Sequence, residues 1–147
     1  MRSVWLLEAL RPGADFVLLA LRLVVGAFLI WGVWDNIVSA ERMAEFETFL
    51  QRNGFPMAQW LAPLSVWAQF ACGVAFVLGL ATRWAGLLCA INFTVALVMV
   101  DAKLGIRAAF PSTLLILLGL YFATRGPGRF ALDAYGKLRA RFEKGPS

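Results

Sequence analysis

Residues 16–34 read FVLLALRLVVGAFLIWGVW, an apolar run with one charge, Arg22, inside it. A helix that crosses the hydrocarbon core of a bilayer needs about 20 predominantly apolar residues, so this run is long enough to span a membrane. The alternative is a signal peptide, because Val38-Ser39-Ala40 faintly resembles a small-residue cleavage site. The run is longer than a typical signal-peptide core and contains an arginine, so we interpret it as a membrane span.

Three further apolar runs follow along the chain. Residues 60–80 hold no charge at all, and residues 84–100 and 108–124 lie at the short end of the range for a span. Backbone in lipid must satisfy its own hydrogen bonds, which a helix does, and the short alternating segments of a β-barrel are absent from the sequence. The sequence therefore predicts an all-α protein, a four-helix transmembrane bundle that forms a single domain over residues 1–147.

The composition of the whole chain supports this prediction. Hydrophobic residues make up 61% of its 147 residues and charged residues 16%. Soluble domains are roughly half apolar and a quarter charged, and a soluble globule of this size has too little interior for so many apolar side chains. These proportions exclude a soluble enzyme, a disordered protein and a disulfide-rich secreted module.

The histidine and cysteine counts limit the chemistry further. The sequence contains no histidine, which excludes zinc or haem ligation by imidazole and any catalytic arrangement that uses histidine. Cys72 and Cys89 lie in separate apolar runs without a CxxC motif. We interpret them as small buried residues, with a pair of redox thiols as the alternative. We expect no metal site and no covalently bound cofactor.

Lysine and arginine residues set the expected orientation, because cytoplasmic loops carry an excess of them. Nine lie on the side that holds both termini, and four lie on the other: Arg2, Arg11, Arg83, Arg125, Arg129, Lys137, Arg139, Arg141 and Lys144 against Arg42, Arg52, Lys103 and Arg107. We therefore expect a multi-pass protein of the bacterial inner membrane with both termini in the cytoplasm. The net charge of +5 is explained by this topology, and we expect no nucleic-acid partner.

Two amphipathic segments lie outside the expected spans. Residues 39–50 follow the capping residue Ser39 and place Met43, Phe46, Phe49 and Leu50 on one face, and Asn53-Gly54 should end this helix. We expect it on the periplasmic membrane surface or over the mouth of the bundle. Residues 125–147 form a basic cytoplasmic tail, in which residues 132–144 form either an interfacial helix or a solvated segment.

Three polar residues inside the spans are candidates for a ligand site. At 1.5 Å per residue, Arg22, Asn92 and Gln69 lie about 9, 12 and 16 Å from the cytoplasmic ends of their runs. At such depths they could bind the carbonyl oxygens of a quinone headgroup or another small polar ligand. The alternative is that Arg22 extends to the headgroups while Gln69 and Asn92 hold helices together.

Glycines recur inside the apolar runs, where small residues allow helices to approach closely. We expect such helix contacts at Gly26, Gly32, Gly73, Gly79, Gly86 and Gly119.

Several ordered motifs resemble the DoxX family of small four-span membrane proteins, from about Leu21 to Asp133. They are LRLVVGAFLIWG in the first span, NGFP before the second, GVAFVLGLATR at its end, INFTVA in the third, and GPGRFALD after the last. In this last motif Gly126 and Gly128 should end the helix at the interface and Arg129 should face the headgroups. Asp133 should either pair with Arg129 or cap the tail helix.

The resemblance implies an inner-membrane protein, in some members a subunit of quinone-linked redox complexes such as thiosulfate:quinone oxidoreductase, or a partner of oxidative-stress enzymes. Family members often have a glutamate where this chain has Gln69, and a lysine near the end of the first span where it has Asp35-Asn36. A glutamine can form hydrogen bonds with a ligand but cannot shuttle protons. If the family's chemistry uses that carboxylate, this chain binds without catalysing.

These observations lead to three hypotheses. The first is a subunit of a membrane redox system with a lipid-facing quinone pocket around Arg22, Gln69 and Asn92, which depends on a partner subunit for electrons and is not an enzyme alone. The second is a structural or assembly subunit of a membrane complex or a homo-oligomer. The third, a small-molecule carrier, is less consistent with spans that contain a single charge.

Overall fold

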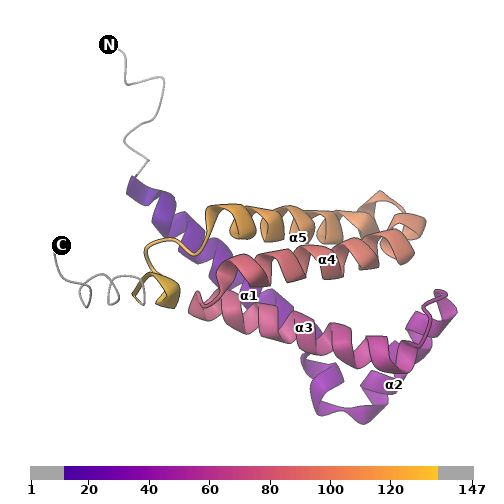
Figure 1. Ribbon diagram of the computed structural model, residues 1–147. Helices are drawn as coiled ribbons and strands as arrows, with labels where there is room; N and C mark the ends of the chain where they lie inside the picture. The colour runs from indigo at the N-terminus through magenta and orange to yellow at the C-terminus, as the bar shows by residue number, and fades with distance from the viewer. Residues whose placement is uncertain (1–11, 136–147) are drawn as a thin grey trace.

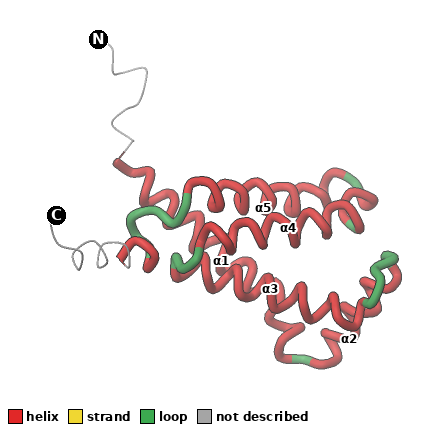
Figure 2. The backbone as a smooth tube through the Cα atoms, viewed as in Figure 1, coloured by secondary structure: helices red, strands yellow, loops and turns green. Residues whose placement is uncertain are grey.

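The computed structural model describes residues 12–135, and over that range the chain contains helices and no strand (Figures 1 and 2). The elements in order are α1 (Ala14–Val38), α2 (Ala40–Arg52), α3 (Ala58–Leu78), α4 (Thr82–Met99), the 3₁₀ helix η2 (Asp101–Leu104) and α5 (Ile106–Arg125). Four of them, α1, α3, α4 and α5, are long and apolar enough to cross a membrane. The prediction of an all-α, four-helix transmembrane fold is therefore confirmed.

The helices differ from the apolar runs mainly at their ends. Helix α1 begins at Ala14 and continues to Val38, whereas the apolar run covers residues 16–34. The residues added at its two ends include Asp15, Asp35 and Asn36. A helix satisfies its own backbone hydrogen bonds, so it can continue past the apolar run to the membrane interface, where polar side chains are solvated. Helices α3 and α4 each begin and end one or two residues earlier than the runs at 60–80 and 84–100.

The bundle consists of two helix pairs joined through α3 and α4. Helix α1 packs along α3, and α4 packs along α5. Figure 1 shows the start of α1, the α3–α4 turn and the end of α5 together on the left, which we call the terminal end. Helix α2 and the α4–α5 connection lie at the opposite, distal end. The two ends of the described chain therefore lie on the same side of the bundle.

Only some of the lysine and arginine residues on which the orientation prediction depends lie within residues 12–135. Arg83, Arg125 and Arg129 lie at the terminal end. Arg2, Arg11 and the tail residues from Lys137 onward lie outside the described residues, as does most of the expected segment 132–144, of which residues 132–135 are helical. Which side of the membrane each end faces stays a prediction.

Glycines bring the backbones of each helix pair into contact. A Cβ added to Gly26 of α1 would lie 2.7 Å from the carbonyl oxygen of Gly73 in α3, and one on Gly73 would lie 2.8 Å from that of Gly26. Gly86 of α4 and Gly119 of α5 face each other in the same reciprocal way. The interpretation as close-packing positions is therefore confirmed for these four glycines, whereas Gly79 lies in the turn after α3 and Gly32 meets only the Gln69 side chain.

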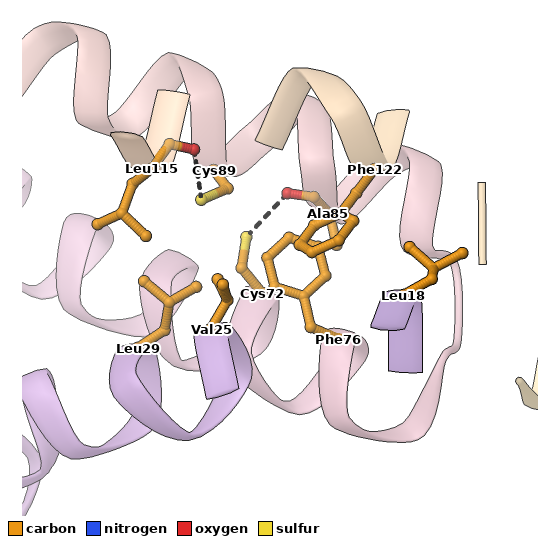
Figure 3. Packing of buried hydrophobic residues seen from close by; sticks show 9 residues of the cluster. All are labelled: Leu18, Val25, Leu29, Cys72, Phe76, Ala85, Cys89, Leu115 and Phe122. Carbon is orange, nitrogen blue, oxygen red and sulfur yellow. Dashed lines mark hydrogen bonds between the residues drawn. The ribbon is translucent and has the colours of Figure 1, made fainter. Parts of the chain in front are cut away.

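The centre of the bundle is an apolar core shared by all four long helices (Figure 3). The rings of Phe76 and Phe122 lie 4.8 Å apart between centroids. Cys72 donates its thiol to the carbonyl of Ala85 at 3.3 Å, and Cys89 donates to Leu115 at 4.0 Å. Both cysteines are free and buried. Their positions support the interpretation as small core residues.

Helix α2 is held against the distal end of α3. Ser39 caps its start by accepting a hydrogen bond from the Arg42 amide. At its end Gly54 has φ of +81°, and the amide of Phe55 donates to the carbonyl of Leu50 at 3.1 Å, which is a Schellman motif. Leu50 is buried against Ala58 and Ala62 of α3. Phe49 stacks on Phe46, in agreement with the expected shared face, and is 44% exposed.

We predict that Gly86→Ala destabilises the bundle by about 1–3 kcal/mol, because the added methyl group would overlap the backbone of α5. Thermal unfolding of the protein in detergent measures the effect. Gly13→Ala is the control, since Gly13 has φ of −75° and nothing within 4 Å of an added Cβ. Equal melting temperatures for both variants would contradict a tight contact between α4 and α5.

Candidate functional site

Arg22 is buried in the terminal end of the bundle, with only 1% of its surface exposed. Its Nε donates to the carbonyl of Phe76 at 3.0 Å, and its Nη1 donates to the carbonyls of Pro127 at 2.5 Å and Phe130 at 3.1 Å. The guanidinium group therefore neither extends to the headgroups nor faces an open cavity. It connects α1 to the last turn of α3 and to the segment that follows α5.

The α3–α4 turn fits closely around this arginine. Gly79 ends α3 in the left-handed region with φ of +69°, and a Cβ on it would collide with Arg22 Nη2 and with Ala131. The backbone amide of Asp133 donates to the carbonyl of Gly79 at 3.1 Å. The turn, the arginine and the segment after α5 thus form one interlocked structure.

Asp133 caps helix α4 from a position far along the chain. Its carboxylate accepts from the amide of Ala81 at 3.0 Å and from that of Thr82 at 3.3 Å. The N-cap residue of α4 is Ala81 itself, whose side chain has no acceptor, so the orphan amides at this helix start need a partner from elsewhere. A carboxylate there also interacts favourably with the helix dipole.

The remainder of the GPGRFALD motif turns the chain across the start of α1. Gly126 and Gly128 both have positive φ, and a Cβ on Gly128 would lie 2.7 Å from Leu18 Cδ2. Arg129 is exposed and lies 3.9 Å from Asp15. Asp133 therefore does not pair with Arg129, as one of our expectations had it, because its carboxylate is directed to the start of α4. The residues 126–133 together with Arg22 and the turn at 79–82 are called the clasp below.

Gln69 lies at the contact between α1 and α3. Its Nε2 donates to the carbonyl of Leu29 at 3.4 Å, and it packs against Gly32, where an added Cβ would lie 3.3 Å from that nitrogen. This position agrees with the alternative in which Gln69 holds two helices together.

Asn92 belongs to α4, faces α3, and lines a cavity. Its Oδ1 accepts a hydrogen bond from the Ser65 hydroxyl at 2.9 Å. The cavity has a volume of about 330 Å³ and is covered at one end by Phe46 and Leu50 of α2. Its walls come from α3 and α4 and are apolar except for Ser65 and Asn92; they include Leu61, Leu64, Leu88 and Val95. We call this cavity the α2–α4 pocket.

The structure thus does not bring the three predicted site residues into one group. Asn92 lines the α2–α4 pocket, and neither Arg22 nor Gln69 does. Each of the three hydrogen bonds to different partners. Ser65, the second polar residue of the pocket, was missed by the sequence analysis. Among residues 12–135, no group of three or more His, Cys, Asp or Glu side chains could hold a metal ion.

Four apolar helices, a glycine-packed core and short connections define a small multi-pass membrane protein. Residues 17–102, more than half of the chain, match the model of the DoxX family, so this protein belongs to the DoxX family. The match ends before the GPGRFALD motif, whose resemblance to the family rests on its sequence alone. No curated protein and no solved structure matches the chain.

We predict that Asp133→Ala lowers stability by about 1 kcal/mol, because the start of α4 loses its only carboxylate cap in the described structure. Thermal unfolding in detergent measures the loss. Arg129→Ala is the matched control from the same motif, since its distant, exposed pair with Asp15 contributes little. A larger loss for Arg129→Ala than for Asp133→Ala would show that the cap is not the main role of the motif.

Proposed function

We propose that this protein is a quinone-interacting subunit of a membrane redox system, and that the α2–α4 pocket receives the ligand's headgroup. One observation carries the proposal, namely an apolar pocket within the membrane helices whose polar lining is limited to the pair Ser65 and Asn92. Ligand sites commonly combine an apolar wall with a few polar groups that fix orientation.

The size and position of the pocket suit a ring-sized headgroup with a long apolar tail. Its volume of about 330 Å³ lies at the lower end of the range for ligand pockets, which is about 300–1,000 Å³. Two of its lining residues, Leu64 and Ile91, are 64% and 54% exposed, on surfaces of α3 and α4 that face lipid in a membrane. A tail could therefore leave the pocket between these helices and continue into the hydrocarbon.

The polar pair supplies hydrogen-bond donors for a carbonyl group. Because Asn92 Oδ1 accepts from Ser65, the amide nitrogen Nδ2 is the free end of this side chain, and it makes no hydrogen bond to residues 12–135. Its two N–H groups can donate to a carbonyl oxygen of the ligand. A bound quinone would supply the capacity to accept and release electrons, while Asn92 binds and orients it.

Electrons have to come from a partner in this proposal. The sequence has no histidine, and the two cysteines donate to carbonyls in the core. Gln69, at the position where family members often carry a glutamate, cannot transfer protons. We therefore propose association with another redox subunit in the bacterial inner membrane, with both termini of this chain in the cytoplasm.

A second candidate function is that of a structural subunit of a membrane complex or a homo-oligomer. The positions of Arg22 and Gln69 agree with it only in that both side chains hydrogen bond to backbone carbonyls of this chain and so have a structural role here. This candidate predicts that polar-to-apolar changes at Asn92 alter stability alone.

We predict that Asn92→Leu weakens the binding of a decyl-substituted benzoquinone to the detergent-solubilised protein by about three- to tenfold, the effect of losing one hydrogen bond. Isothermal titration calorimetry measures the affinity. Gln69→Leu is the matched control, since it makes a comparable change outside the pocket and should bind like wild type. Ala96→Phe should abolish binding, because Ala96 lines the pocket and a phenyl ring would fill it.

Two results would contradict the proposal. One is the absence of saturable binding to the wild-type protein. The other is wild-type affinity in both Asn92→Leu and Ala96→Phe, which would place any bound quinone elsewhere.

A further inference from the structure

We propose that the terminal end of the bundle binds an anionic phospholipid, whose phosphate lies between Arg83 at the start of α4 and Arg125 at the end of α5. The ligand class is a phospholipid with a net negative charge, such as phosphatidylglycerol. This site is separate from the α2–α4 pocket, whose lining includes neither arginine. The inference therefore goes beyond the proposed function and does not depend on it.

The two arginines lie at the same end of one helix pair. Helix α4 packs along α5, and Figure 1 shows the start of α4 and the end of α5 together at the terminal end. Arg83 is the second residue of α4, and Arg125 is the last residue of α5. The ends of membrane-spanning helices lie at the depth of the lipid headgroups, so both arginines are placed where phosphate groups are found.

The guanidinium group of Arg83 is held against the end of α5. Its Nη1 donates to the carbonyl of Ala123 at 3.1 Å. A Cβ added to Gly126 would lie 3.2 Å from both Nε and Nη2, so the group rests on the backbone of the residue that follows Arg125. Only Nη1 hydrogen bonds to residues 12–135, which leaves the N–H groups of Nε and Nη2 available to a phosphate oxygen.

The positive charge of both arginines is available to a ligand. Both side chains are exposed, and neither forms an ion pair with a carboxylate of residues 12–135. Two acids of the terminal end have other partners, because Asp133 accepts from the start of α4 and Asp15 lies 3.9 Å from Arg129. Guanidinium groups form charge-assisted hydrogen bonds with phosphate, so two of them at one interface favour a phosphate ligand.

The surface beside the arginines suits the remainder of a lipid molecule. Trp84 follows Arg83 and is 76% exposed, and the exposed Tyr121 lies about one turn before Arg125. Trp and Tyr are enriched at headgroup depth, since each combines an apolar ring with a polar group. Leu87, about one turn further along α4, is also exposed, so an acyl chain attached to the phosphate meets apolar surface.

Each arginine should contribute about fivefold to the affinity for an anionic lipid. Wild type should therefore bind phosphatidylglycerol more tightly than phosphatidylcholine with the same acyl chains, because the choline headgroup has no net charge. Arg83→Gln and Arg125→Gln should each weaken the binding of phosphatidylglycerol about fivefold. The double variant should bind both lipids with similar affinity.

The test is native mass spectrometry of the intact, delipidated protein in a mild detergent, titrated with each lipid to obtain dissociation constants. Arg125→Gln is the decisive variant, because this side chain makes no hydrogen bond to residues 12–135 and its loss should leave the fold intact. Thermal unfolding shows that Arg83→Gln, which loses the bond to Ala123, is still folded.

Arg107→Gln is the matched control. Arg107 is the second residue of α5, is equally exposed and forms no ion pair with residues 12–135. It lies at the distal end, roughly 30 Å from the proposed site along the helix, so this variant should bind phosphatidylglycerol like wild type.

Four results would overturn the inference. The first is equal affinity of the wild-type protein for the two lipids. The second is an unchanged preference in the double variant, which would assign the attraction to other charges of the chain. The third is an equal loss in Arg107→Gln and Arg125→Gln. The fourth is displacement of the lipid by an equal concentration of sn-glycerol 3-phosphate, which would assign the site to soluble phosphate compounds.

Discussion

The buried guanidinium of Arg22 is the constraint on which the terminal end of the structure depends. A charged group inside a membrane bundle is stable only when its donors are paired, because burial removes the water that would otherwise solvate it. Here the partners are backbone carbonyls from the last turn of α3 and from the segment after α5. Those elements cannot separate without leaving the arginine and the carbonyls unpaired. One side chain on the first helix therefore positions the last described segment of the chain.

The two ends of the bundle differ in what their polar groups do. At the terminal end, the hydrogen bonds of Arg22 and Asp133 are made within the protein. At the distal end, Asn92 keeps a free amide nitrogen beside an apolar pocket that α2 covers. The polar groups of the terminal end are thus paired within the protein, whereas those of the distal end line a cavity. Between the helices, one pair of facing glycines brings α1 against α3 and another brings α4 against α5.

Hydropathy predicted the spans because it depends only on local composition, and the glycines were recognised because small residues have one main use between membrane helices. The site was harder to predict. Depth along a helix can be estimated from residue number, but the direction in which a side chain points around the helix depends on packing. Gln69 therefore faces α1 while Asn92 faces α3, although their depths are similar. The bond from Arg22 to Pro127 joins residues 105 positions apart, which no local pattern reveals. Ser65 gave no signal, because a serine in a span commonly hydrogen bonds to its own helix.

The clasp also has a consequence for how the chain is made. Residues 127–133 are synthesised after all four spans, yet they supply carbonyls to Arg22 in the first span and the carboxylate to the start of α4. A nascent chain that has inserted its helices still has a membrane-embedded charge and exposed amides without their final partners. The contacts of the clasp can form only after residues 127–133 have been synthesised. A chain truncated before residue 127 would lack both the carbonyls that Arg22 uses and the carboxylate at the start of α4.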